Sequence, residues 1–169
     1  MSKHHITRAG PALLALAGCA SHSGLWQAYP GQPLPLDAVS LLRGKSGYRN
    51  ELKSNEMIRI LEVNGKAVPN QRGVAPGAEA VTLLPGKHII RIMYVVSVNY
   101  WNFTTYHNLT LNLQENCHYQ IVALISSGSE SPKSFDDLQT DFHVHGETIN
   151  TRKRANCGNP ELEPDQANT

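Results

Sequence analysis

The feature that most restricts the fold of this chain is a period-two pattern of apolar residues, interrupted by turn dipeptides. The β-branched run Met57–Val63 ends in Asn64-Gly65, the dipeptide with the strongest preference for a two-residue hairpin turn. Pro85-Gly86 separates two further runs in the same way. Since a helix would need an apolar period of 3.6, the pattern predicts strands joined in hairpins. We expect these strands over residues 57–63, 66–68, 80–84, 88–98, 103–113, 118–125 and 141–149.

Two of these strands indicate how the sheets are arranged. The strand over 88–98 is apolar at both parities, which is typical of a central strand covered on each side, or of a sandwich edge that abuts a partner. In the strand over 103–113, apolar residues alternate with polar ones. One face of this strand is therefore expected to pack on the core and the other to be exposed to solvent. Residues 36–42 fit either a first strand or a single helical turn. The pattern as a whole predicts an all-β fold, a single antiparallel β-sandwich.

The hairpin sequence Val81-Thr82-Leu83-Leu84-Pro85-Gly86-Lys87-His88 resembles a hairpin that recurs in small bacterial envelope β-domains. Such hairpins occur in PEGA-like modules and in uncharacterised lipoprotein families, and Val63-Asn64-Gly65-Lys66 fits the same layout. The resemblance covers roughly residues 57–125 and implies an immunoglobulin-like or related sandwich. Its motifs specify turns, so it implies no catalytic residue.

The N-terminus has the layout of a secretory signal peptide. Lys3 and Arg8 precede an apolar run that is too short to span a bilayer. Leu16-Ala17-Gly18-Cys19 resembles the lipobox of bacterial lipoproteins. The resemblance implies that Cys19 becomes the first mature residue and carries acyl chains such as palmitate. It also implies the outer membrane as destination, because Ala20 stands where an aspartate usually signals inner-membrane retention. The alternative is a plain secretory signal that leaves Cys19 as an ordinary thiol.

Composition divides the rest of the chain. We expect a signal peptide over 1–18, a Gly- and Pro-rich tether over 19–35, the sandwich over 36–157 and a disordered polar tail over 158–169. Without the signal peptide, 13 Lys and Arg remain against 14 Asp and Glu, a formal charge of −1. Nucleic acid is therefore excluded as a partner, because binding to phosphates needs a concentrated positive face.

The three cysteines have different expected roles. With Cys19 lipidated, Cys117 and Cys157 remain as an even pair in an oxidising compartment, which predicts a disulfide between them. The alternative is that one of the two is a buried free thiol or a nucleophile.

The densest group of chemically active side chains is Asp141-Phe142-His143-Val144-His145-Gly146-Glu147. In a strand, residues two apart face the same way, so both histidines and both carboxylates would share one side. Nitrogen and oxygen ligands of this kind suit Zn²⁺ or Cu²⁺. The alternative is the solvent-facing side of an amphipathic strand, whose polar residues are histidines and carboxylates.

A second group collects aromatic residues where a hairpin is expected to turn. Tyr100, Trp101 and Tyr106 accompany several asparagines, and aromatic rings with amide donors suit a sugar ring or the strand edge of a partner. The alternative is a packed corner of the sandwich. The sequence has no Gly-x-Ser-x-Gly elbow, no glycine-rich phosphate loop and no Cys-x-x-Cys motif, so we do not expect an enzyme.

These observations predict a lipid-anchored, non-enzymatic module of the bacterial cell envelope that binds or supports another envelope component. Its expected partners are the membrane, through the lipid, and an envelope protein or glycan. The expected location is the outer membrane, facing the periplasm, and no cofactor is needed. The alternative is a periplasmic protein that binds Zn or Cu through Asp141, His143, His145 and Glu147.

Overall fold

The computed structural model describes residues 25–49, 54–70, 76–98, 101–127, 138–150, 152 and 155–160. The expected signal peptide, Cys19 and most of the expected tail over 158–169 lie outside the described residues. No helix in the described ranges is long and apolar enough to cross a membrane.

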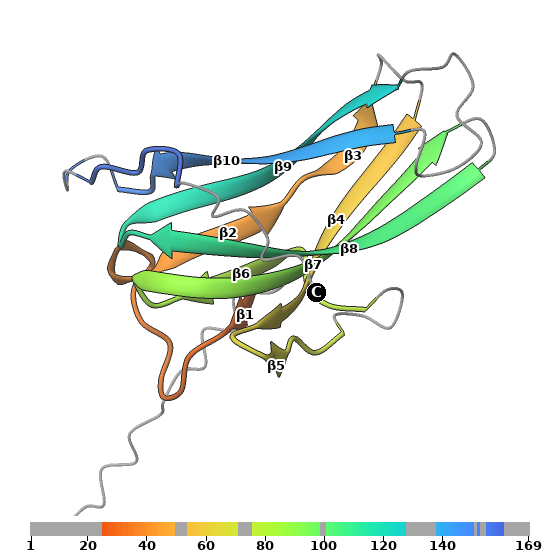
Figure 1. Ribbon diagram of the computed structural model, residues 1–169. Coiled ribbons are helices and arrows are strands. Elements are labelled where there is room, and N and C mark those ends of the chain that lie inside the picture. The colour runs from red at the N-terminus through yellow and green to blue at the C-terminus, as the bar shows by residue number, and fades with distance from the viewer. Residues whose placement is uncertain are drawn as a thin grey trace, which may run out of the picture.

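The described chain is all-β, as the alternation predicts, and forms two five-stranded sheets packed face to face (Figure 1). Sheet A has the order β1 (Leu25–Gln27), β6 (Ala80–Leu83), β2 (Ser40–Gly44), β9 (Cys117–Ser127) and β10 (Leu138–Thr148). Sheet B has the order β3 (Ser46–Arg49), β4 (Ser54–Val63), β7 (Gly86–Val98) and β8 (Trp101–Leu113), with β5 (Lys66–Ala67) paired to β4.

The expectation of an antiparallel sandwich is correct for sheet B and wrong in part for sheet A. β1 pairs with β6 in parallel, and β2 pairs with β9 in parallel. Neither pair is joined by a hairpin, since the partners come from distant parts of the chain. Local alternation carries no information about such pairings.

The hairpins follow from the turn residues. Asn64 and Gly65 both have positive φ, 52° and 75°, which the two-residue turn between β4 and β5 requires. Gly86, with φ 126°, opens β7. β7 lies between β4 and β8 in sheet B, so the expected central position of this strand is correct. Its outer face is not fully covered, since Ile89 is 54% exposed.

A single residue, Lys45, carries the chain from one sheet to the other. Its N–H donates to Ile121 O of sheet A at 3.0 Å, and its carbonyl accepts from Ile58 N of sheet B at 3.1 Å. A Cβ at the preceding Gly44 would overlap the backbone carbonyl of Ile58. Glycine is therefore needed where the chain passes from sheet A to sheet B.

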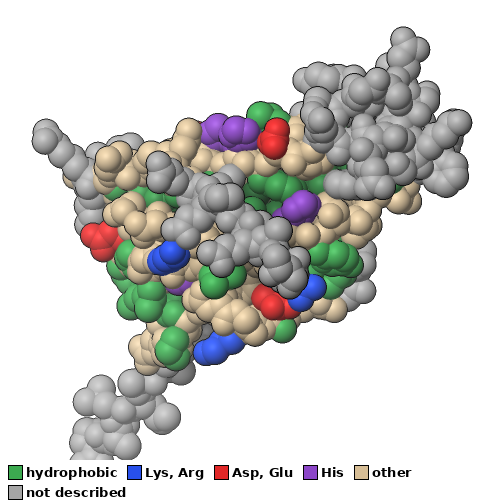
Figure 2. Space-filling model, in the orientation of Figure 1, with side chains coloured by type: hydrophobic (Ala, Val, Ile, Leu, Met, Phe, Trp, Pro, Cys, Tyr) green, Lys and Arg blue, Asp and Glu red, His purple; other side chains and the backbone are tan. Residues whose placement is uncertain are grey.

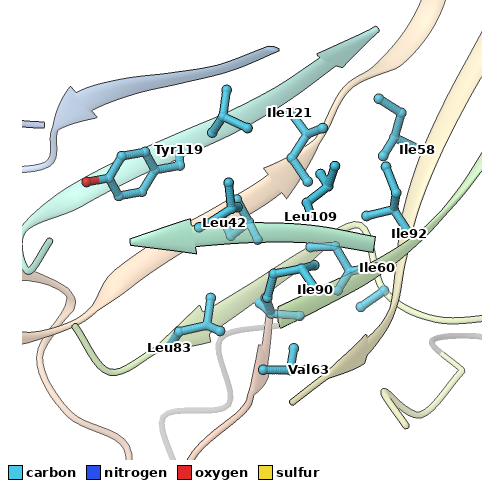
Figure 3. Close-up of a cluster of buried hydrophobic side chains, with 14 of the residues drawn as sticks. Leu42, Ile58, Ile60, Val63, Leu83, Ile90, Ile92, Leu109, Tyr119 and Ile121 are labelled. Atoms are coloured by element: carbon cyan, nitrogen blue, oxygen red, sulfur yellow. The ribbon is translucent and has the colours of Figure 1, made fainter. Parts of the chain in front are cut away.

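The core lies between the two inner faces (Figure 3). Sheet B contributes Ile58, Ile60, Ile90 and Ile92, and these pack against Leu42, Tyr119 and Ile121 of sheet A, all fully or almost fully buried. The β10 strand adds Phe142, whose ring lies 5.7 Å from Tyr94 and 4.6 Å from His107 in sheet B. Aromatic contacts therefore hold β10 against the opposite sheet.

The domain begins earlier in the chain than the expected boundary at residue 36. Leu25–Gln27, placed by composition within the tether over 19–35, form β1 at the edge of sheet A. Ala28 N donates to Thr82 O at 2.9 Å and extends this attachment. Both readings of residues 36–42 hold in part, since a 3-10 turn (η1, Leu36–Ala38) leads directly into β2.

Candidate functional site

The β10 strand places its four candidate ligands on one face, as the period of two predicts. Asp141, His143, His145 and Glu147 are all exposed. Between them, Val144 is 3% exposed and Phe142 is half-buried against the core. The strand is therefore amphipathic, and its polar side forms part of the outer surface of sheet A.

Neighbouring strands extend this polar surface. In the register of β9, His118 lies opposite Glu147, Gln120 opposite His145 and Val122 opposite His143. Gln120 also lies beside Arg43 of β2. We call this set the β10 face, made up of Asp141, His143, His145, Glu147, His118, Gln120 and Arg43. Figure 2 shows histidine and acidic side chains next to each other along the rim where β10 runs.

His118 has the most altered electrostatics on the β10 face. Burial lowers its pKa, the positive charge of Arg43 lowers it further, and the carboxylate of Glu147 acts in the opposite direction. Its Nε2 atom is buried, without a hydrogen-bond partner among the described residues. The ring is therefore held neutral at neutral pH.

The four predicted ligands share a face, yet they do not converge on a point. Within the described ranges, no group of three or more His, Cys, Asp or Glu side chains is arranged to hold a metal ion. Alternate residues of a strand stand nearly 7 Å apart and project side by side. The β10 face is therefore a row of donors and acceptors along one strand, an arrangement that suits contact with an extended partner.

The aromatic group expected at a hairpin tip lies largely outside the described residues. Tyr100 lies outside the described residues, as does the side chain of Trp101, the first residue of β8. Tyr106 lies five residues further along the strand, about 17 Å away. It is 55% exposed on the outer face of sheet B, with the Arg91 guanidinium carbon 5.8 Å from its ring centroid.

Sequence analysis missed a buried acidic residue. The Glu56 side chain is fully buried, with its carboxylate 3.4 Å from Lys45 Nζ, and Tyr94 Oη donates to it at 3.5 Å. The parity of the strand was an available signal, because Glu56 shares the inward side of β4 with Ile58 and Ile60. The expected strand began one residue later, at Met57.

A second missed interaction holds the segment before β6. The buried Arg59 guanidinium donates to Gly77 O at 2.6 Å and pairs with Glu79 at 3.3 Å. Ile60 and Ala78 exchange two backbone hydrogen bonds beside it. These contacts attach the segment around Gly77 and Ala78 to the edge of β4 and give Arg59 a structural role.

The predicted disulfide between Cys117 and Cys157 is present, with Cα atoms 5.5 Å apart. It joins the first residue of β9 to the segment over 155–160. That segment crosses Gly146 of β10 so closely that a Cβ there would overlap the carbonyl of Cys157. Asn116, with φ 58°, completes this end of the sheet, since its side chain exchanges two hydrogen bonds with the backbone of Asn150 at 2.8 and 3.1 Å.

Comparison with known proteins does not assign the chain to a family. No protein-family model matches the chain, and no curated protein or solved structure is significantly similar to it.

Proposed function

We propose that this protein is a lipid-anchored, non-enzymatic module of the bacterial cell envelope that binds or supports another envelope component. The observation that carries the proposal is the disulfide between Cys117 and Cys157. Disulfides persist in oxidising compartments such as the periplasm. Because the pair uses two of the three cysteines in the sequence, Cys19 is left as the third, directly after Leu16-Ala17-Gly18.

The position of β1 supports a close attachment to the membrane. β1 begins at Leu25, six residues after Cys19, and six extended residues span at most about 22 Å. A lipid on Cys19 would therefore hold the β1 edge of sheet A near the bilayer. In the sheet order, β10 stands at the opposite edge, four strand spacings or almost 20 Å away (Figure 1).

This arrangement presents the β10 face to other components of the envelope. Its carboxylates, imidazoles and Arg43 offer hydrogen-bond donors and acceptors of both charges on the outer surface of sheet A. For the fold, two sheets packed around one core favour the immunoglobulin-like or related sandwich implied by the hairpin resemblance. The metal-binding alternative has no comparable support, because the described part of the chain shows no group of three ligands.

Metabolic labelling with a palmitate analogue tests the anchor. The parent protein is expected to incorporate the label and to fractionate with the outer membrane. Cys19→Ser should lose both properties and still form the disulfide between Cys117 and Cys157. Ser21→Ala serves as the matched control and should behave as the parent. Labelling of Cys19→Ser to the same level as the parent would contradict the proposal.

A photo-crosslinking residue tests the binding surface. Placed at His143 in cells of the native host, it should yield a discrete adduct with an envelope protein or glycan. The same residue at Ile89, exposed on the outer face of sheet B, is the control. Equal adducts from both positions, or none from His143, would argue against the β10 face as the contact surface.

A further inference from the structure

Among the described residues, five strands lie at a sheet edge, and one of them lacks the usual protection against pairing with another chain. β1, β3 and β5 are short, with three, four and two residues. β10 carries Asp141 and Glu147 on its exposed face and a glycine between them. Short length and charged side chains are the devices by which sheet edges avoid pairing.

β8 has neither device. It is 13 residues long, and all 13 residues pair with β7 in one unbroken register, with no bulge. Between Trp101 and Leu113 the sequence contains no Lys, Arg, Asp, Glu, Pro or Gly. Among the described residues, β7 is the only strand paired to β8, so β8 stands at the edge of sheet B.

The sequence of β8 is complementary to its own reverse. Its outward side chains, from first to last, are Asn102, Thr104, Tyr106, Asn108, Thr110 and Asn112. We propose that β8 pairs with β8 of a second copy of this chain, antiparallel, about a two-fold axis at His107. Asn102 then faces Asn112 of the second copy, Thr104 faces Thr110 and Tyr106 faces Asn108.

This register satisfies the physical requirements of an isologous interface. In an antiparallel pair, N–H and C=O groups point to alternate sides along each strand, so residues of equal parity must face each other. The proposed pairs meet this condition. Facing hydroxyls and amides form hydrogen-bonded cross-strand pairs, and no Lys, Arg, Asp or Glu meets its like, since the strand contains none. On the inner side Phe103 faces Leu111, so apolar side chains also meet across the axis.

Pairing would make one continuous sheet from the two copies of sheet B, with the four strands β3, β4, β7 and β8 repeated in reverse order. The same surface contributes from both copies, as a two-fold interface requires. The interface uses the edge of sheet B, whereas the β10 face belongs to the outer surface of sheet A, so the two proposals rest on different residues and can fail separately.

Register-specific cysteine crosslinking in the full chain tests the proposal. The double variant Thr104→Cys/Thr110→Cys places each new cysteine opposite the other one in the second copy. Cα atoms facing each other in an antiparallel pair are about 4.5–5.5 Å apart, within the range of a disulfide. Within one chain, the two positions are six strand residues, or about 20 Å, apart, so they cannot join. We expect a covalent dimer as the main species on non-reducing gels, which reducing agent converts to monomer.

Three controls make the outcome decisive. Each single variant should give only the dimer background of the parent. Thr104→Cys/Asn112→Cys, shifted by two residues, should also stay at background. Adding Tyr106→Lys to the reactive pair should remove the crosslink, because lysine blocks an edge. The melting temperature should fall only slightly, because Tyr106 is exposed and loses only its contact with Arg91.

The proposal is overturned if Thr104→Cys/Thr110→Cys stays monomeric under oxidation. Equal dimer from the shifted control would also overturn it, since collision rather than register would then explain the crosslink. A covalent adduct with a different protein would assign the edge to another partner and likewise exclude the second copy.

Discussion

Replacing Gly146 with alanine should destabilise the protein through one methyl group. Gly146 lies in β10, under the segment that the disulfide joins to β9. A Cβ at this position would overlap the carbonyl oxygen of Cys157 and lie 2.7 Å from Cε1 of Tyr119. Both neighbours resist movement, since Tyr119 is a buried core residue and Cys157 is covalently held.

The expected cost follows from two opposing effects. Overpacking of this kind typically costs about 1–3 kcal/mol. Alanine also restricts the unfolded chain, which returns about 0.4–1 kcal/mol. We therefore expect Gly146→Ala to lower the free energy of unfolding by roughly 1–2 kcal/mol. Equilibrium denaturation in urea, with an unchanged m-value, measures this difference.

The chain provides a matched control for this substitution. A Cβ at Gly158, in the same segment, would meet only Asn156 Oδ1 at 3.7 Å, an ordinary contact. Gly158→Ala should therefore leave stability within about 0.5 kcal/mol of the parent. If Gly146→Ala is as stable as Gly158→Ala, the segment over 155–160 does not cross β10 at this point and the reasoning is refuted.

A double-mutant cycle tests whether the disulfide causes the strain. In a background with Cys117→Ser and Cys157→Ser, the segment can retreat from the new methyl group. Gly146→Ala should then cost at least about 0.5 kcal/mol less than in the disulfide-bonded protein. Equal costs in both backgrounds would show that core packing, and not the covalent link, holds the segment in place.

Three further results are expected. Removing the disulfide with Cys117→Ser/Cys157→Ser should cost about 4 kcal/mol in urea unfolding, because the bridge closes a loop of 40 residues; a loss below about 1 kcal/mol would contradict this. His118 has a lowered pKa, so its neutral form stabilises the fold above about pH 6.5, and this contribution is lost as pH falls from there through its lower folded pKa. Between pH 7 and 5, the free energy of unfolding of His118→Gln should therefore fall less than that of the parent. Parallel falls of the two proteins would refute this role of His118. Phe142→Ala should cost about 2–3 kcal/mol, somewhat less than for a fully buried ring, against under about 0.5 kcal/mol for the exposed Leu124→Ala.

Much of sheet B could be predicted from the sequence because its contacts are local. β7 and β8 adjoin in the chain and share one antiparallel register, so the alternation that defines each strand also defines its two faces. The same reasoning placed His143 and His145 outward and Val144 inward on β10. The disulfide between Cys117 and Cys157 was predicted from the number of cysteines and from the expected oxidising compartment.

Prediction was poorer where a residue's role depends on a distant segment. Leu25–Gln27 lie in a Gly- and Pro-rich stretch, and only the exposed edge of β6 makes them a strand. Glu56 is buried because Lys45, at the crossing between the sheets, brings a positive charge to it. The β10 face likewise depends on β9 and β2, which bring His118 and Arg43 beside Glu147.

By itself, the sequence predicted seven of the ten described strands, β4 to β10, together with their hairpin turns and the alternation of their faces, and it favoured the pairing of Cys117 with Cys157. Backbone sterics and hydrophobic periodicity act over a few residues, so these features can be read locally. Only the tertiary structure decided that β2 pairs in parallel with β9, that Gly44 and Lys45 carry the chain between the sheets, and which strands form the edges. Those outcomes depend on packing two sheets around one core, where segments far apart in the chain compete for the same neighbours.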